Sequence, residues 1–362
     1  MVNVVRRVSA YKKQLHSLLP VGLALHHHGH PAARLRVERL YGVPVILSGL
    51  SALVLSKQEQ NIIYECHKNS LMRLMKLHDR TPDSVVFFLA GSLPITALLH
   101  LRRLSLFNMI CHLEGNILRD IAKELLVVAK PSAKSWCQEI RGLCIMYELP
   151  HPLHMIENPI SKEKFKKLCK QKVLDYWHKK LTSKACLPSL QYLHPGFLSL
   201  TRPHPIWTSL DNNPYQAKAA RIQAVFLSGR YRSERLCRFW SNNRNGFCVL
   251  PICKNQNIFE DIEHTFLRCQ SLTDVRRRLD EFTREYISDK PVLQPTVETY
   301  LYSPYDYERM QFFLDCSVLP LVISSYQQHG PVIHQHLFRI SRTWCRSLHV
   351  ARMKRLGRYV RA

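Results

Sequence analysis

The sequence predicts a mainly α-helical protein, and three observations lead to this prediction. Apolar residues recur at helical spacing over long stretches, as in Ile117, Ile121, Leu125 and Val128. Prolines that cannot continue a helix separate these stretches, at Pro82, Pro94, Pro131 and Pro150. A hydrophobic fraction of 46% over 362 residues allows a buried core and roughly two or three domains.

Residues 1–30 read as a basic N-terminal segment. No Asp or Glu occurs in residues 1–37, and basic residues interleave with apolar ones, as they do in mitochondrial transit peptides. Mitochondrial targeting therefore stays open. The histidine cluster from His26 to His30 lacks a framework of spaced ligands, so we interpret it as a polar loop rather than a metal site.

Residues 31–150 are predicted to form the first helical region. It contains two apolar runs, 41–56 and 84–101. The first is shorter than the ~20 residues of a membrane span, and the second carries Gly91, Pro94 and His100. We interpret both runs as buried core helices and expect no membrane span.

Residues 151–215 combine a very basic helix with a Pro-rich linker. The helix is expected from Ser161, as its N-cap, to about Leu181, and residues 185–215 are expected to be irregular. An apolar stripe occupies one side of this helix. Much of the remaining surface is lysine, including Lys164, Lys166, Lys167 and Lys170.

Residues 216–290 begin with a predicted helix over 217–227 and continue into a Cys/His-rich module. A short helix over 259–268 should end just before Cys269, and Ser271 with Asp274 predicts a capping box for the next helix. The last region, 291–362, is basic. Its predicted helices cover about 307–325 and 332–358.

Four clustered residues predict a metal site in region 216–290. They follow the pattern C-x4-C-x10-H-x4-C, formed by Cys248, Cys253, His264 and Cys269. Three thiolates and one imidazole complete a tetrahedral shell, so we expect one structural zinc ion. The alternative is three buried cysteines and a helical histidine without a metal. Cys237 is a candidate fifth participant, although packing against Trp240 is the simpler interpretation.

The charge of the chain predicts a polyanionic partner. Fifty-two Lys and Arg stand against 27 Asp and Glu, a formal net charge of +25. RNA or DNA is the first candidate, an anionic membrane surface is the second, and a merely basic protein is the third possibility.

Basic and aromatic residues gather in three places, where cations can neutralise phosphates and aromatic rings can stack on bases. The candidate contacts are Lys164, Lys166, Lys167, Lys170, Arg230, Tyr231, Arg232, Arg235, Arg238, Trp240, Arg339, Arg342 and Arg346. The alternative for each place is a solvated helix face with its aromatic rings in the core. Phosphate contacts and base stacking do not involve the 2′-hydroxyl, so the choice between RNA and DNA stays open.

The sequence argues against catalysis by the chain alone. It contains no Gly-rich phosphate loop, no G-x-S-x-G and no H-E-x-x-H. It also lacks an Asp-Asp pair in an apolar strand context, which two-metal phosphoryl chemistry requires. The remaining cysteines stand mostly on apolar helical stretches, as buried thiols of an intracellular protein do, so a nuclear or cytoplasmic location is expected.

Several runs of the sequence resemble the C-terminal part of reverse transcriptases from non-LTR (LINE-type) retrotransposons. They are LRVERLYGVPVILSGL (35–50), SVVFFLAGSLP (84–94), LHLRRLSLFNMI (99–110), KEKFKKLCK (162–170), SLTRPHPIWT (199–208), QAVFLSGRYRSERLC (223–237), EDIEHTFLRC (260–269), LDCSVLP (314–320) and RTWCRSLH (342–349). Together they extend over nearly the whole chain.

The resemblance implies a helical thumb-like and connector region up to about residue 150, and a zinc-binding tail whose ligands are the Cys/His cluster. In that family the tail is thought to engage template RNA or target DNA. The family's Y/F-x-D-D active-site turn and its upstream Asp are absent from this sequence. The resemblance therefore implies a truncated product that binds nucleic acid and lacks the polymerase active site. The alternative is a product that needs a separate palm-bearing chain.

Overall fold

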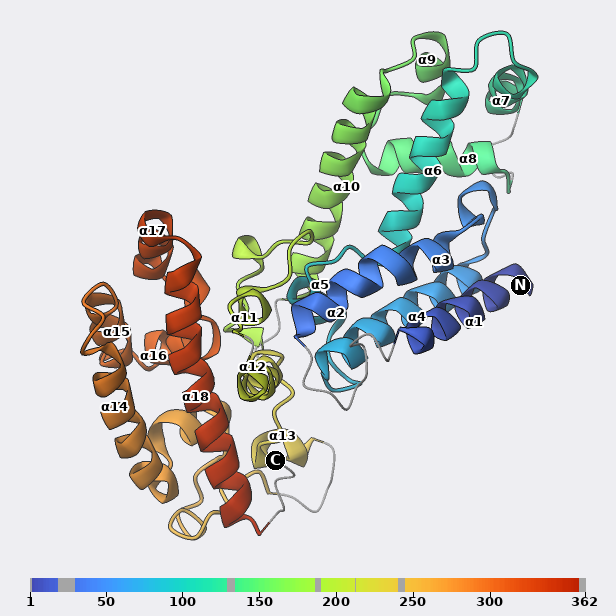
Figure 1. The fold of residues 1–362 in the computed structure, drawn as a ribbon. Helices are drawn as coiled ribbons and strands as arrows, with labels where there is room; N and C mark the ends of the chain where they lie inside the picture. Colours follow the sequence, from blue (N-terminus) through green and yellow to red (C-terminus); the bar gives the residue numbers. More distant parts are fainter. Residues whose placement is uncertain are drawn as a thin grey trace.

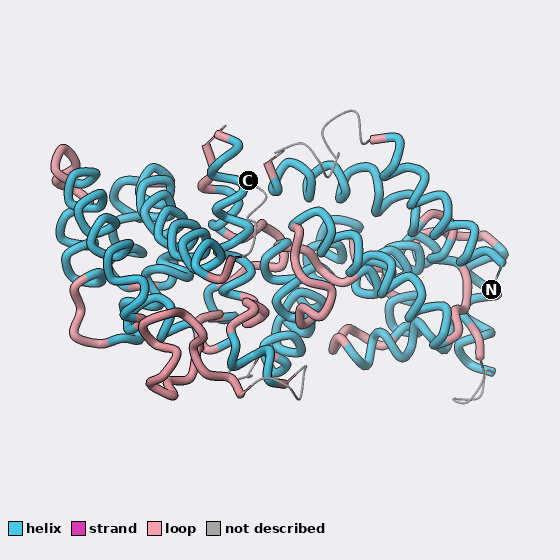
Figure 2. Tube along the Cα trace, turned by 90° about the horizontal axis from the view of Figure 1, so that it is seen from below, coloured by secondary structure: helices cyan, strands magenta, loops and turns pink. Residues whose placement is uncertain are grey.

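The computed structural model is mainly α-helical, which confirms the predicted fold class. It describes residues 2–18, 30–128, 134–185, 190–211, 213–239 and 245–357. Within these ranges there is no β-strand, and the only β-type pairing is an isolated antiparallel bridge between Phe247 and Phe259. Figure 2 shows helices joined by loops throughout.

Among its described residues, the N-terminal part holds helices α1 to α10 and two irregular turns. These are α1 (Val2–Ser17), α2 (Pro31–Val37), the π-turn Glu38–Gly42, α3 (Val43–Leu47), the 3-10 turn Leu50–Ala52, α4 (Lys57–Met75), α5 (Asp83–Ala90), α6 (Ile95–Cys111), α7 (Ile117–Val128), α8 (Trp136–Met146), α9 (Pro152–Glu157) and α10 (Lys162–Lys184). Pro82 and Pro94 stand at the N-caps of α5 and α6, as the sequence predicted. Pro131 and most of the histidine cluster lie outside the described residues.

The C-terminal part holds shorter helices around one long one. These are the 3-10 turn Pro195–Phe197, α11 (Pro205–Thr208), α12 (Pro214–Leu227), α13 (Glu234–Arg238), the π-turn His264–Arg268, the 3-10 turn Gln270–Leu272, α14 (Thr273–Ile287), α15 (Gln294–Leu301), α16 (Asp306–Asp315), the 3-10 turn Cys316–Val318, α17 (Pro320–His329) and α18 (Pro331–Arg355). Figure 1 shows α12 between the N-terminal helices and α18. Helix α18 packs against α12, α14, α16 and α17.

Two hydrophobic cores hold the helices together. A small core joins α1, α3, α4 and α6, with Val4, Tyr11 and Ile63 fully buried in it. A much larger core begins at Leu35 in α2 and continues to Leu348 in α18. It crosses the residues where the sequence places region boundaries, so the helical regions share one interior.

The loop 199–211 ties the two parts to each other. Arg39 donates to the carbonyl of Thr201 at 3.0 Å, and the amide of His204 donates to the carbonyl of Leu89 at 3.1 Å. The two backbone segments approach so closely that a Cβ on Gly91 would lie 1.9 Å from the carbonyl oxygen of Arg202. Only glycine fits there.

Further along the same loop, the buried His204 ring lies 3.2 Å from the buried Asp315 carboxylate at the end of α16. This contact reaches the C-terminal helices and, with the bond from His204 to Leu89, links α5 to them.

Ser161 is the N-cap of α10, as predicted, although its side chain makes no capping hydrogen bond. Two other local predictions were wrong in detail. Ser271 does not cap α14, whose N-cap is Leu272, because the Ser271 hydroxyl accepts from the amide of Ile252 instead. The helix expected over 307–325 breaks into α16 and α17, because the Asp315 carboxylate accepts from the Ser317 amide and a 3-10 turn follows.

Among the described helices, no single one combines the length and apolar character needed to cross a membrane. One pair, α5 and α6, meets these criteria together but is bent by 64° at its break. Every residue of α5 except Asp83 is buried in the protein interior.

Candidate metal centre

The four predicted ligand residues converge. One ligand atom from each of Cys248, Cys253, His264 and Cys269 lies within 4.8 Å of the others, and all four side chains are buried. The Sγ atoms of Cys253 and Cys269 are 3.7 Å apart. Cys237 is half-buried on α13 and is not part of this group.

A tight loop supplies the first two ligands. The bridge between Phe247 and Phe259 closes its base, and the amide of Cys248 donates to the carbonyl of Ile258 at 2.8 Å. The amide of Cys253 then donates to the carbonyl of Leu250 at 3.0 Å, which turns the chain back. Gly246 leads into the loop with φ of +84°, a conformation that favours glycine.

The π-turn His264–Arg268 begins with one of the other two ligands, His264, and is followed directly by the second, Cys269. The Asp261 carboxylate accepts from the amide of His264 at 2.7 Å and so starts the turn. The amide of Cys269 donates to the carbonyl of His264 at 2.7 Å and so ends it. The predicted helix over 259–268 is shorter than expected because Phe259 is held in the bridge. The Ser271 hydroxyl, bound to Ile252, joins the two ligand-bearing segments.

Two features of the cluster bear on whether it could hold a cation. Neither ring nitrogen of the buried His264 has a hydrogen-bond partner among the described residues. Buried polar atoms are normally paired, and an ion is one standard reason for an exception. The neighbouring Cys269 thiol and burial together raise the pKa of Cys248. A bound dication would oppose this effect by stabilising the thiolates. The cluster could therefore hold a metal ion.

A buried ion pair anchors the metal-site loop to α18. Both carboxylate oxygens of Glu260 accept from the Arg352 guanidinium, at 2.7 and 2.8 Å. Glu260 also accepts from the amide of Glu234, the first residue of α13, at 2.7 Å. One carboxylate thus fixes the position of the cluster relative to α13 and α18.

Most of the predicted nucleic-acid contacts are accessible to solvent but lie apart from one another. Lys164, Lys166, Lys167 and Lys170 are exposed in the first turns of α10, far from α13 in Figure 1. Arg232, Arg235, Arg238 and Arg339 are exposed, and Arg230 and Arg346 are half-buried. Trp240 lies outside the described residues.

Two of the predicted contacts were wrong because their side chains are buried. The Tyr231 ring stacks on Phe226, with ring centres 3.8 Å apart, so neither face is open to a base. Arg342 is 1% exposed, and its guanidinium donates to the hydroxyl and carbonyl oxygens of Ser209 at 3.1 and 3.2 Å. Arg342 therefore joins α18 to α11 instead of sharing a solvent face with Arg339.

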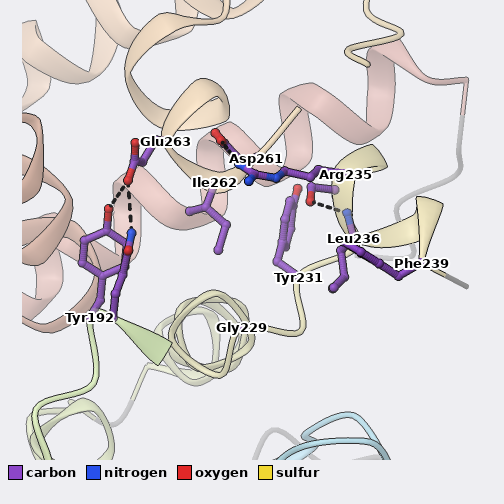
Figure 3. A pocket seen from close by; sticks show the side chains of 11 residues that line it. Tyr192, Gly229, Tyr231, Arg235, Leu236, Phe239, Asp261, Ile262 and Glu263 are labelled. Atoms are coloured by element: carbon purple, nitrogen blue, oxygen red, sulfur yellow. Dashed lines mark hydrogen bonds and ion pairs between the residues drawn. The ribbon is translucent and has the colours of Figure 1, made fainter. Parts of the chain in front are cut away.

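A pocket of about 410 Å³ beside the cluster contains residues that the sequence analysis did not select (Figure 3). Asp261 accepts from Arg235 at 3.0 Å, and Glu263 accepts from the Tyr192 hydroxyl at 2.7 Å. Phe239, which is 78% exposed, lies at its edge. Because Asp261 neutralises Arg235, this pocket is a weaker place for a phosphate than the sequence alone indicates.

Comparisons of the chain with protein-family models, with curated proteins and with solved structures found no match.

Proposed function

We propose that the chain is a zinc-stabilised, non-catalytic nucleic-acid-binding protein derived from a non-LTR retrotransposon reverse transcriptase. The observation that carries the proposal is the buried cluster of four potential ligands within 4.8 Å, in a chain of net charge +25. The chain works inside the cell, where RNA and DNA are its partners.

The donor set favours zinc. Thiolate and imidazole ligands in a four-residue group are typical of tetrahedral zinc sites. All four donors come from the protein and all are buried, so no position is open to water or substrate. A closed shell is the mark of a structural zinc ion, and here it would hold the loop 248–253 against the π-turn.

Exposed cations support nucleic acid as the partner. The lysines at the start of α10 and the arginines just before and within α13 provide charge for backbone phosphates. The absence of the Y/F-x-D-D motif from the sequence supports a binding role without polymerase chemistry.

An accessory role beside a palm-bearing chain is the second candidate. It is supported by helix α7, whose apolar residues Ile117, Ile121, Leu125 and Val128 are exposed along one face. Purified alone, such a chain should extend no primer. Extension should appear only when a second chain supplies the catalytic carboxylates, and extension by the chain alone would contradict both candidates.

The first test measures zinc in the full chain, with His264→Ala beside Cys237→Ser. We expect one zinc per chain in the wild type and in Cys237→Ser, because Cys237 lies outside the cluster. His264→Ala should lose the ion or hold it about tenfold or more weakly, as when a ligand is removed. Equal zinc content in all three proteins, or none in any, would contradict the proposal.

The second test measures binding of single-stranded RNA and DNA by fluorescence anisotropy at several salt concentrations. If the chain contacts several phosphates, affinity should fall steeply, by ~10³-fold or more between about 50 and 200 mM salt, as counterions are released. Absence of binding, or an affinity that does not change with salt concentration, would contradict the proposal.

A further inference from the structure

A cavity of about 770 Å³ lies where the N-terminal and C-terminal parts of the chain meet. The end of α4 contributes Lys76 and His78, and the segment after α12 contributes Arg230 and Arg232. Its volume is within the ~300–1,000 Å³ typical of ligand sites.

The cavity has an excess of positive charge. Arg352 also lines it, but the Glu260 carboxylate neutralises that guanidinium. Asp79 is the lining carboxylate, and it is 93% exposed and 3.3 Å from His78. Lys76, Arg230 and Arg232 therefore outnumber it.

Two more cations lie close enough to Lys76 to affect its charge. Arg34 of α2 and Arg221 of α12 are buried. Burial, and then the charge of Arg34, lowers the pKa of Arg221 to about 10. Burial lowers the pKa of Lys76 as well, followed by the charges of Arg221, Arg34 and Lys218. These charges thus disfavour the protonated form of Lys76, and an anion beside its ammonium group would favour that form.

The backbone at Lys76 supplies an independent observation. Lys76 ends α4 in the left-handed region, with φ of 54° and ψ of 41°. Its amide donates to the carbonyl of Arg73 at 3.1 Å, and the amide of Leu77 donates to the carbonyl of Met72 at 2.9 Å. Glycine is the usual residue at such a helix end, because a side chain there is strained. A lysine kept in a strained conformation beside a ligand-sized cavity points to a use for its ammonium group.

We propose that this cavity binds a backbone phosphate of the nucleic-acid strand, held by Lys76, Arg230 and Arg232. The inference rests on the proposed function, since it names where the partner's phosphate sits. Charge-assisted hydrogen bonds from an ammonium and from planar guanidinium groups are the usual means of holding a phosphate. The site also places the strand across the junction of the two parts of the chain.

The test uses Lys76→Gly, because glycine relieves the backbone strain while removing the charge. Affinity for single-stranded RNA and DNA should fall roughly tenfold, the loss of one charge-assisted contact. The slope of log affinity against log salt should fall by ~1. The melting temperature should stay equal or rise. Arg230→Gln with Arg232→Gln should weaken binding further.

The control, Lys57→Gln with Arg277→Gln, removes two exposed charges on α4 and α14 away from the cavity. Its salt slope should match the wild type. Lys76→Gly binding as tightly as the control would overturn the inference and leave the proposed function standing. If wild type binds no oligonucleotide at low salt, the proposed function fails and the inference with it. A rise in melting temperature with tripolyphosphate that occurs in the wild type and not in Lys76→Gly would then assign the cavity to free phosphate.

Discussion

Glu38 places a carboxyl group inside the protein, where it meets the small core under α1. It is 1% exposed, accepts from the Tyr11 hydroxyl at 2.8 Å and lies 3.5 Å from the His67 ring. Burial raises the pKa of Glu38 to about 7 and lowers the pKa of His67 to about 3. Both groups are thus driven toward their neutral forms, because the interior disfavours charge.

We predict that Glu38→Gln stabilises the protein at high pH and much less at low pH. Because the folded-state pKa is raised, ionisation of Glu38 lowers the free energy of unfolding. The loss is near zero below the unfolded value of 4.5 and grows as the pH rises toward about 7. The gain should be on the order of 2–3 kcal/mol at about pH 8 and near zero at about pH 4.5. Denaturant midpoints at both pH values measure it.

Glu65→Gln is the matched control, since Glu65 is exposed on α4 and pairs with Lys68 at the surface. It should show no comparable pH-dependent gain. The His67 contribution, whose depressed pKa removes stability as the pH falls below about 6.5, is present in all three proteins and cancels in the comparison. A gain for Glu38→Gln that is equal at both pH values would refute the ionisation argument.

At the residue scale, the metal ligands could be predicted from the sequence, whereas the burial of predicted nucleic-acid contacts such as Arg342 could not. The Cys/His spacing is a local property, because each pair of ligands lies on one short segment. Burial of Arg342 depends on Ser209, and burial of Tyr231 depends on Phe226, which packs in the core. For Arg342 the contact is non-local, so its charge and spacing gave no sign of it.

At the scale of elements, the Glu260–Arg352 pair controls how the metal-site loop docks on α18. Both side chains are 1% exposed. Removing one partner of such a pair leaves a charge buried without compensation, at a cost of about 3–5 kcal/mol. We predict this loss for Arg352→Met in chemical denaturation, together with weaker zinc retention, because Glu260 also positions α13.

Arg355→Gln offers the control one turn along α18. Its partner Asp274 is half-exposed, and exposed pairs contribute at most about 1 kcal/mol. The double variant Glu260→Gln, Arg352→Met should recover part of the loss, because no charge is left unpaired. If Arg352→Met were no more costly than Arg355→Gln, the pair would not anchor the loop.

Helix boundaries were predictable where prolines or capping residues act locally and failed where a tertiary contact competes. Ser56 and Glu59 form a capping box at the start of α4, with hydrogen bonds of 2.9 and 3.2 Å. Ser271 has the same sequence signature, but Ile252 competes for its hydroxyl. The difference lies in a partner 19 residues away, which no local pattern contains.

At the scale of the molecule, the helical class followed from local periodicity, whereas the junction of the two parts did not. The contacts that form the junction join residues far apart in sequence, such as Arg39 with Thr201 and His204 with Asp315. The phosphate cavity exists only because of that junction. Lys76 and Arg230 lie far apart in the sequence, and neither residue alone indicates a phosphate site.

Removal of the metal should loosen one end of the molecule and spare the other. Cys248, Cys253 and Cys269 belong to the large core that includes α12 and α18, whereas the small core of α1, α3, α4 and α6 contains none of the ligands. A structural ion at about 1,000 times its Kd stabilises the folded state by ~4 kcal/mol, and chelation removes that contribution.

We therefore predict that chelation speeds amide hydrogen exchange in residues 245–272 and the last turns of α18. Protection should persist in α1 and α3, whose buried residues belong to the small core. Cys237→Ser, with its zinc retained, should exchange like the wild type before chelation. A uniform rise in exchange along the whole chain would instead mean that the large core transmits the loss to every helix, and that the chain unfolds as one cooperative unit once the ion is gone.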